Sequence, residues 1–185
     1  MNRSETLAHT RTLVLQLQSG QADAFQGLME RTRERAFRLA MCICRDRHLA
    51  EDIVQEAYLS VYRSIHQLRE PLAFQTWLAR IIDNRSRQVM GKRRSIVMDE
   101  EQRRQAAGDP ATTGLARKVA GRMNLQDAMD RLTEYDRQII TLREVMGYTY
   151  DEIAEILEVP VGTVRSRLAN ARRRLAGLLQ GDNTL

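Results

Sequence analysis

The stretch from Tyr148 to Leu175 reads YTYDEIAEILEVPVGTVRSRLANARRRL, and its pattern predicts two helices joined by a tight turn. Thr149 and Glu152 have the spacing of a capping box, which fixes the start of the first helix. The dipeptide VP at positions 159–160 interrupts the helical pattern and indicates the turn. Thr163 can cap the second helix. Together these signals predict a helix-turn-helix.

Apolar residues recur at helical spacing in both halves of this stretch, so each predicted helix has a face to bury. The site in the turn that often holds glycine is occupied by Glu158. A residue other than glycine in a left-handed conformation costs about 1 kcal/mol, so we expect a turn that is slightly strained or different. The side chains predicted to be buried are Ile153, Ala154 and Leu157 in the first helix and Val164, Leu168, Ala171, Leu175 and Leu178 in the second.

The opposite face of the second helix is polar and rich in arginine. Arginine can donate to guanine, asparagine can pair with adenine, and alanine can touch the methyl group of thymine. An ordinary amphipathic helix with a solvated basic face would carry the same charges, but the capped helix and short turn before it favour DNA binding. The candidate DNA-binding residues are Thr163, Arg165, Ser166, Arg167, Ala169, Asn170 and Arg173, and Arg172 and Arg174 suit phosphates, as does Arg167.

The composition permits a polyanionic partner without requiring one. The 185 residues carry a formal charge of +5, and every cationic residue except Lys92 and Lys118 is arginine. The planar arginine fork suits phosphates and base edges, although codon bias in a GC-rich genome would produce the same excess. No stretch approaches the ~18 consecutive apolar residues of a membrane span, and the N-terminus lacks the layout of a secretory signal. We therefore expect a cytoplasmic protein.

Two cysteines and a histidine lie close together in the sequence but give only weak evidence for a metal site. Cys42 and Cys44 point to different faces of a helix, so no disulfide between them is expected. His48 could share a face with Cys44, but a closed zinc site needs about four ligands. Reduced structural thiols are favoured, and direct redox or metal sensing stays open. No metal, cofactor or catalytic group is predicted, because the sequence has no nucleotide-binding glycine loop and no metal-ligand cluster.

Helical spacing of apolar residues also covers most of the remaining chain, with no alternating pattern typical of strands. The stretch 95–121 differs, because it mixes charges, small residues, glycines and a proline and has little to bury. We predict an all-α protein of two helical domains, 1–94 and 122–185, joined by a flexible linker at 95–121 with about one helical turn. A helix capped by Thr133 and ended by Gly147 is expected to bury Tyr135, Ile139, Ile140, Leu142 and Val145.

Three stretches, in this order, resemble a bacterial sigma factor of the extracytoplasmic-function (ECF) type. AEDIVQEAYLSVY at 50–62 resembles the family's helix for binding core polymerase, and FQTWLARIIDNRSRQ at 74–88 resembles its minus-10 helix. The stretch 148–175 resembles its minus-35 helix-turn-helix, and the whole resemblance covers roughly residues 24–179. It implies a protein that binds core RNA polymerase and directs promoter-specific initiation, while the polymerase performs the catalysis.

The resemblance gives a role to an exposed acidic face of the first of these stretches. On a helical wheel, Asp52, Gln55, Glu56 and Leu59 gather on the side away from the apolar row. An acidic surface with an exposed leucine suits a basic protein partner. The resemblance implies that this partner is the clamp helices of the polymerase β′ subunit, and that the β flap is a further polymerase contact.

The minus-10 element must be melted as well as bound. Opening a duplex costs about 1.4 kcal/mol per step, and a protein can offset this by capturing unstacked bases. By resemblance, a flipped base is held at the loop 66–72 that precedes the FQTW helix. Asn84 matches the family's asparagine, and its amide can both donate to and accept from a base edge. Arg80, Arg85 and Arg87 are expected to contact phosphates.

Two other functions fit parts of the pattern. A conventional helix-turn-helix transcription regulator would use residues 24–94 for sensing or dimerisation, and would bind promoters without polymerase. A DNA-processing enzyme such as a recombinase would need a nucleophile with supporting acids or arginines, and no serine or tyrosine stands in such a setting. The resemblance also implies an anti-sigma factor that covers functional faces of both domains, with a compact inhibited form and an extended active form.

Overall fold

The computed structural model describes residues 3–107 and 124–180, and within these ranges the chain is helical and contains no strand. This confirms the all-α prediction for the described part of the chain. The α-helices are α1 (Arg3–Gln18), α2 (Ala24–Cys44), α3 (Arg47–Ser64), α4 (Phe74–Ala107), α5 (Leu125–Arg131), α6 (Glu134–Ile140), α7 (Tyr150–Leu157) and α8 (Val161–Gln180). Two 3₁₀ turns, η1 (Ile65–Gln67) and η2 (Pro71–Ala73), connect α3 to α4.

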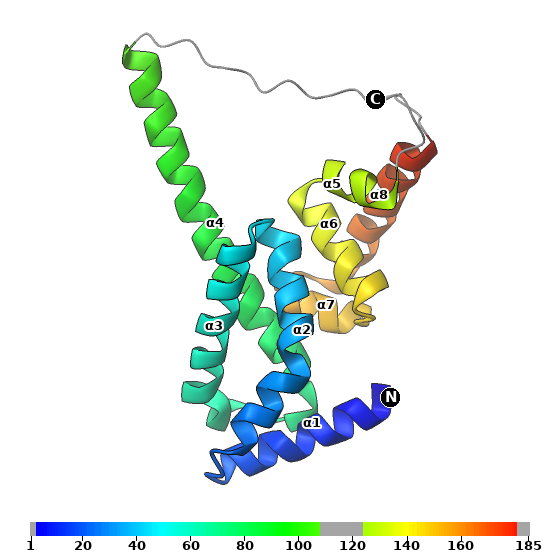
Figure 1. The fold of residues 1–185 in the computed structure, drawn as a ribbon. Helices are drawn as coiled ribbons and strands as arrows, with labels where there is room; N and C mark the ends of the chain where they lie inside the picture. The colour runs from blue at the N-terminus through cyan, green and yellow to red at the C-terminus, as the bar shows by residue number, and fades with distance from the viewer. Residues whose placement is uncertain (1–2, 108–123, 181–185) are drawn as a thin grey trace.

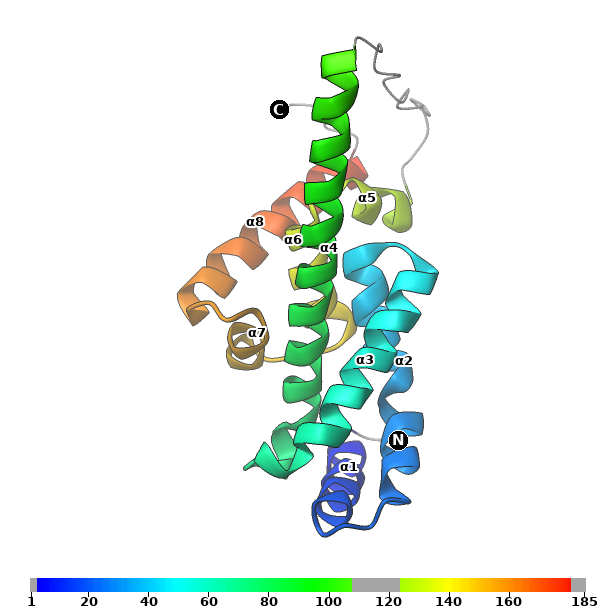
Figure 2. The same cartoon turned by 90° about the vertical axis from the view of Figure 1, so that its left-hand side faces the viewer.

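The N-terminal domain is formed by α1 to α4. Helices α2 and α3 pack against each other and against the first half of α4, and α1 crosses one end of this group (Figures 1 and 2). Removing apolar side chains from water stabilises the arrangement by about 25 cal/mol per Å² of buried surface. The largest fully buried side chains of this domain are Leu28, Leu39, Ile43, Ile53, Phe74 and Ile82.

Helix α4 is longer than the sequence predicted. It continues to Ala107 and therefore includes the first part of the expected linker, where we predicted about one helical turn. Residues 95–107 contain no glycine or proline, and Glu, Gln, Arg and Ala are strong helix formers. The helix extends well beyond the domain core (Figure 2). The remainder of the expected linker, 108–121, lies outside the described residues.

The predicted helix-turn-helix is present as α7 and α8. The Glu152 backbone N–H donates to the Thr149 hydroxyl and the Thr149 N–H donates to the Glu152 carboxylate, which confirms the capping box. Glu158 has a φ of 54°, the left-handed conformation in which a non-glycine residue is strained. Thr163 does not cap α8, because that helix already begins at Val161 and Thr163 lies in its first turn.

The apolar stripe of α8 packs against α5, α6 and α7. This packing places the opposite face of α8 at the outer edge of the C-terminal domain (Figure 1). The predicted stripe is confirmed, since Ile153, Ala154, Leu157, Val164, Leu168 and Ala171 are buried and Leu175 and Leu178 are half-buried.

A π-helical turn, η3 (Thr141–Val145), continues α6 and corrects one prediction. Such a turn inserts one extra residue into the helical register, so the side chains that follow are rotated relative to α-helical spacing. Val145, which we expected to be buried, is 59% exposed. Ile139, Ile140 and Leu142 precede or enter the turn and are buried as predicted.

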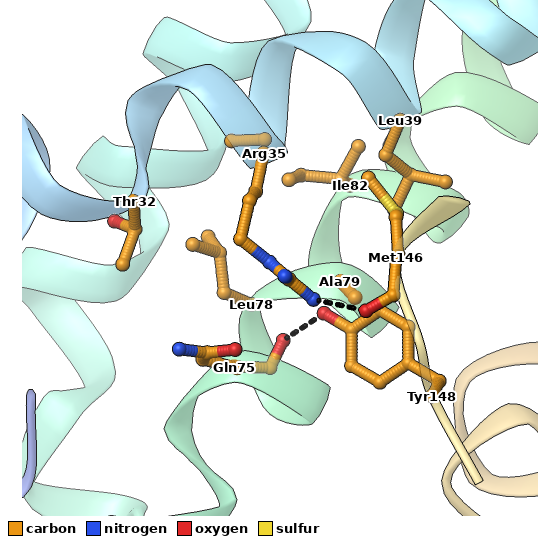
Figure 3. A pocket seen from close by; sticks show the side chains of 10 residues that line it. Thr32, Arg35, Leu39, Gln75, Leu78, Ala79, Ile82, Met146 and Tyr148 are labelled. Atoms are coloured by element: carbon orange, nitrogen blue, oxygen red, sulfur yellow. Dashed lines mark hydrogen bonds between the residues drawn. The ribbon is translucent and has the colours of Figure 1, made fainter. Parts of the chain in front are cut away.

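The two domains pack against each other, with α6, η3 and α7 lying on α2 and α4 (Figure 1). Figure 3 shows Met146 and Tyr148, from the segment after η3, against Leu39, Leu78 and Ile82 of the N-terminal domain. Both Met146 and Tyr148 are buried. The interface is therefore apolar at this end.

Backbone acceptors at the same end of the interface are used by side chains of the opposite domain. The Arg35 guanidinium donates to the Met146 carbonyl at 2.9 Å, and the Tyr148 hydroxyl donates to the Gln75 carbonyl at 3.2 Å (Figure 3). At the other end, Arg137 donates to the Cys42 carbonyl at 2.8 Å. Such bonds depend on both distance and direction, so they fix the relative position of the domains.

A buried polar pair joins α4 to α6 within this interface. The Gln138 amide donates to the Asp83 carboxylate, which also pairs with Arg87 one helical turn along α4. Asp83 and Gln138 are both buried. Desolvation raises the pKa of Asp83 above its ordinary value, and the Gln138 hydrogen bond and the Arg87 charge oppose that rise.

The backbone at Gly147 generates the first prediction. Gly147 has a φ of +70° whereas Gly177 lies inside α8, and an added Cβ would meet no atom within 4 Å at either site. Gly147→Ala therefore tests backbone strain alone, and we expect the free energy of unfolding to fall by about 1–2 kcal/mol. Gly177→Ala is the matched control and should raise it by about 0.5–1 kcal/mol. Chemical denaturation measures both, and equal effects would contradict strain at Gly147.

The raised pKa of Asp83 generates the second prediction. Because the pKa is higher in the folded chain, folding favours the protonated carboxyl. That stabilisation is complete below the ordinary value of 3.8 and is lost as the pH rises through the folded pKa. We expect Asp83→Asn, which cannot ionise, to gain stability relative to wild type as the pH rises from about 4 to about 7. Urea denaturation across this range measures the difference, and a difference independent of pH would contradict the shift.

Candidate nucleic-acid and protein interfaces

The polar face of α8 is exposed as the sequence predicted. Within the described part of the chain, Arg165, Asn170 and Arg173 have no side-chain hydrogen bond or ion pair, so these groups are available to a ligand. The N-terminal half of the helix presents Arg165 and Asn170, an arrangement that can place donors in a major groove. Six of the candidate residues are exposed, namely Arg165, Ser166, Arg167, Ala169, Asn170 and Arg173, and Thr163 is half-buried.

Arginines on the flanks of α8 are engaged within the C-terminal domain. The Arg167 guanidinium lies 4.2 Å from the centre of the Tyr135 ring, a cation–π contact. Arg172 pairs with Glu144, and Arg174 pairs with Asp136 at 2.6 Å. These contacts support the helix, and both ion pairs include exposed guanidinium groups that can still approach phosphates.

The candidate minus-10 arginines of α4 all have acidic partners. Arg80 pairs at 2.6 Å with Glu158, which stands in the turn of the helix-turn-helix. Arg85 pairs at 3.1 Å with Glu56, one of the candidate polymerase-binding residues of α3. Arg87 pairs with Asp83 and also donates to the Leu157 carbonyl at 3.3 Å. Asn84 shares this part of α4 and is half-buried.

The loop 66–72 before α4 is held by a residue that the sequence analysis missed. The Gln18 amide, at the end of α1, donates to the Ile65 carbonyl at 2.9 Å and to the Leu68 carbonyl at 2.8 Å. Glu70 caps the second 3₁₀ turn by accepting from the Leu72 N–H. A lone glutamine in an amphipathic helix carries no signal of such a role, because its partners lie about 50 residues away.

The acidic face of α3 is exposed. Asp52, Gln55, Glu56 and Leu59 all lie on the surface, and Leu59 is 55% exposed. An open groove runs beside them between α2 and α3, and its apolar lining consists of Phe25, Met29, Phe37, Val54, Tyr58 and Leu59. Charged residues of both signs also line the groove, namely Glu30, Glu34, Glu51, Arg33 and Arg47. An apolar groove with such a rim, beside the acidic face of α3, fits a protein partner better than a nucleic acid.

The cysteines show no sign of a metal centre. Cys42 and Cys44 are free thiols, and the described residues contain no cluster of three or more groups that could hold a metal ion. The Cys42 thiol donates to the Thr141 hydroxyl at 3.2 Å, across the domain interface. Desolvation raises the pKa of Cys42, which lowers its reactive thiolate fraction. His48 is exposed.

No described helix combines the length and the apolar character that crossing a membrane requires.

Two family models match the chain, one for each domain. Sigma-70 region 2 matches residues 28–96, which include most of α2, all of α3 and the packed part of α4. Sigma-70 region 4 matches residues 122–175, which include α5 to α7 and most of α8. The matches are in the order that the sequence motifs predicted.

Characterised relatives agree with these models. The RNA polymerase sigma-H factor of Pseudomonas aeruginosa is 31% identical over 95% of this chain and 96% of its own length. The ECF sigma factor SigE of Mycolicibacterium smegmatis is 34% identical over 82% of this chain, which spans 60% of that longer protein. The sigma factor RpoE of Bartonella quintana, solved with the anti-sigma factor NepR, has the same fold, with a TM-score of 0.67 and 23% identity over 86% of this chain and 98% of its own. The ECF sigma-E factor of Haemophilus influenzae is 32% identical over 92% of this chain and 95% of its own length. The chain therefore belongs to the ECF group of the sigma-70 family of RNA polymerase sigma factors.

Proposed function

We propose that the free polar face of α8 binds the minus-35 element of promoters to which this sigma factor directs core RNA polymerase. The observation that carries this assignment is the exposed row containing Arg165, Asn170 and Arg173, which have no side-chain partner within the described chain. Arg165 can donate two hydrogen bonds to a guanine, and Asn170 can pair with an adenine. The remaining candidates on this face, Thr163, Ser166, Arg167 and Ala169, contact the DNA backbone or a thymine methyl.

In this proposal the minus-10 element is bound and melted by α4 and the loop before it. Asn84 contacts a base edge, Arg80, Arg85 and Arg87 contact phosphates, and the loop 66–72 holds an unstacked base. Gln18 acts as a positioning residue for this loop, because its two hydrogen bonds fix the backbone on both sides of His66.

The exposed face of α3 docks on the clamp helices of the polymerase β′ subunit, with the C-terminal domain contacting the β flap. Asp52, Gln55 and Glu56 provide charged and polar contacts, and Leu59 provides an apolar anchor. The chain supplies promoter specificity in the cytoplasm and performs no catalysis. An anti-sigma factor controls it by covering these faces, as the Bartonella relative is bound by NepR.

Transcription in vitro tests this function directly. Purified core polymerase is incubated with genomic promoter fragments, with and without the chain, and start sites are mapped. We expect new start sites that depend on the chain. An unchanged set of start sites, or failure of the chain to co-elute with core polymerase, would refute the proposal.

Arg165 generates the third prediction. Arg165→Ala should weaken binding of the holoenzyme to minus-35 DNA by about 1–3 kcal/mol, because it removes a bidentate hydrogen bond to a base. Arg131→Ala is the control, because Arg131 is exposed on α5, outside the proposed DNA face. Footprinting of both variants on one promoter measures the effect, and an Arg165→Ala footprint like that of wild type would exclude the contact.

Gln18 generates the fourth prediction. Gln18→Leu removes both donors to the loop, so we expect slower promoter melting, seen as reduced permanganate reactivity of unpaired thymines. On a template that is already open at the minus-10 element, the variant should initiate like wild type. Gln16→Leu on the same helix is the control, since no hydrogen bond joins the Gln16 side chain to this loop. An equal loss on duplex and pre-opened templates would indicate a general folding defect instead.

A further inference from the structure

Leu72 is a large apolar side chain that the fold leaves in water. It is 50% exposed and stands at the end of the loop 66–72, in the 3₁₀ turn η2 that leads into α4. Two other exposed apolar side chains have clear surroundings. Leu59 belongs to the face proposed to bind polymerase, and Tyr62 packs edge-on against the Phe25 ring, with 5.1 Å between the ring centres. Neither explanation extends to Leu72.

The backbone that carries Leu72 is fixed on both sides. Pro71 begins the turn and restricts its own φ, and the Leu72 N–H donates to the Glu70 carboxylate at 3.2 Å. The Ala73 N–H donates to the Glu70 carbonyl at 2.9 Å. Helix α1 packs against η2, and α4 follows it directly (Figures 1 and 2). The side chain is therefore presented to solvent from a defined position.

The aromatic rings at the start of α4 are less available to DNA than Leu72 is. Phe74 is fully buried in the core of the N-terminal domain. Trp77 is half-buried, and its ring lies against Phe74 with 6.1 Å between the ring centres. A base that leaves the stack beside this loop therefore meets an aliphatic side chain more readily than either ring.

An unstacked base leaves a gap in the duplex, and the face of the neighbouring base pair loses its cover. Proteins that distort DNA fill such gaps with apolar side chains, leucine among them. A cation also stands close to Leu72 in the chain, since Arg69 is exposed and has no hydrogen bond or ion pair within the described residues. Glu70 is exposed and repels phosphates, but its carboxylate is engaged by the Leu72 N–H.

We propose that Leu72 is the wedge of promoter melting: its side chain enters the gap that the unstacked minus-10 base leaves and covers the neighbouring base pair. This inference rests on the proposed function of the loop 66–72. The loop holds the base, Gln18 holds the loop, and Leu72 keeps the gap from closing. The two domains need not move for this contact, because Leu72 is already exposed in the free chain.

A photocrosslinking amino acid at position 72 tests the contact directly. Replacing Leu72 by p-benzoylphenylalanine puts a reactive ketone at the proposed wedge, and the DNA is a promoter identified by transcription in vitro. We expect ultraviolet light to link position 72 of the holoenzyme to bases next to the unstacked base in open complexes. Complexes kept closed at low temperature should give little of this product. The same replacement of Leu15, 42% exposed on α1, is the control and should give no such product.

Leu72→Ala tests whether the contact assists melting. The stacking free energy of one step corresponds to about a tenfold change in the opening equilibrium, and one leucine recovers part of it. We therefore expect the variant to melt the promoter about threefold to tenfold more slowly, measured by the fluorescence of 2-aminopurine in the minus-10 element. On a template already unpaired at this element it should initiate like wild type. Leu15→Ala is the matched control and should melt the duplex normally.

Two further variants separate an apolar wedge from a structural role of the turn. Leu72→Met keeps an apolar side chain of similar volume, so it should melt the promoter within about twofold of wild type. Leu72→Asn keeps much of the size and is polar, so it should be as slow as Leu72→Ala. Urea denaturation should give the same free energy of unfolding for all three variants, because the side chain is exposed.

Three results would overturn the wedge while leaving the proposed function intact. They are open complexes without a crosslink from position 72, melting by Leu72→Ala at the wild-type rate, and an equal loss by this variant on duplex and pre-opened templates. Normal melting by Leu72→Asn would also exclude an apolar contact. If wild-type chain redirects no transcription by core polymerase, the proposed function fails and the wedge fails with it.

Discussion

The hydrogen bond between Asp83 and Gln138 is the contact on which the arrangement of the two domains depends. Both side chains are buried, and the Gln138 amide would lose its partner without Asp83, whose carboxylate also pairs with Arg87. Apolar contacts around Met146 add buried surface area to the interface. They fix the alignment of the two domains less narrowly than a directional hydrogen bond between buried groups does. The bond from Arg87 to the Leu157 carbonyl follows from this alignment, whereas the pairing of Arg87 with Asp83 lies within α4.

The faces of helix α4 have different partners: one packs in the core of the N-terminal domain, and another contacts the C-terminal domain. Phe74, Leu78 and Ile82 belong to the core of the N-terminal domain, while Asp83 and Arg87 meet the C-terminal domain. The basic groups proposed to contact DNA are therefore neutralised within the chain, whereas those on the polar face of α8 are not. In this structure the polar face of α8 is exposed, while Arg80 and Arg87 of α4 have partners in the C-terminal domain.

Local elements of this protein could be predicted from its sequence. The capping box at Thr149 and the stripe containing Val164 and Leu168 depend on residues within a few turns of one another, so spacing alone indicates them. The errors were also local. Thr163 lies in the first turn because α8 begins earlier than expected, and Val145 is exposed because a π-helical turn changes the register.

The sequence by itself determined the helical fold, the helix-turn-helix, the exposed faces of α3 and α8, and the resemblance that the family comparison confirmed. Only the tertiary structure decided that Arg80 meets Glu158, 78 residues away, and that Gln18 holds the loop before α4. Periodicity specifies which face of a helix is buried, because neighbouring turns share a side. It does not specify which distant charge or carbonyl that face will meet, since this depends on how the finished domains pack.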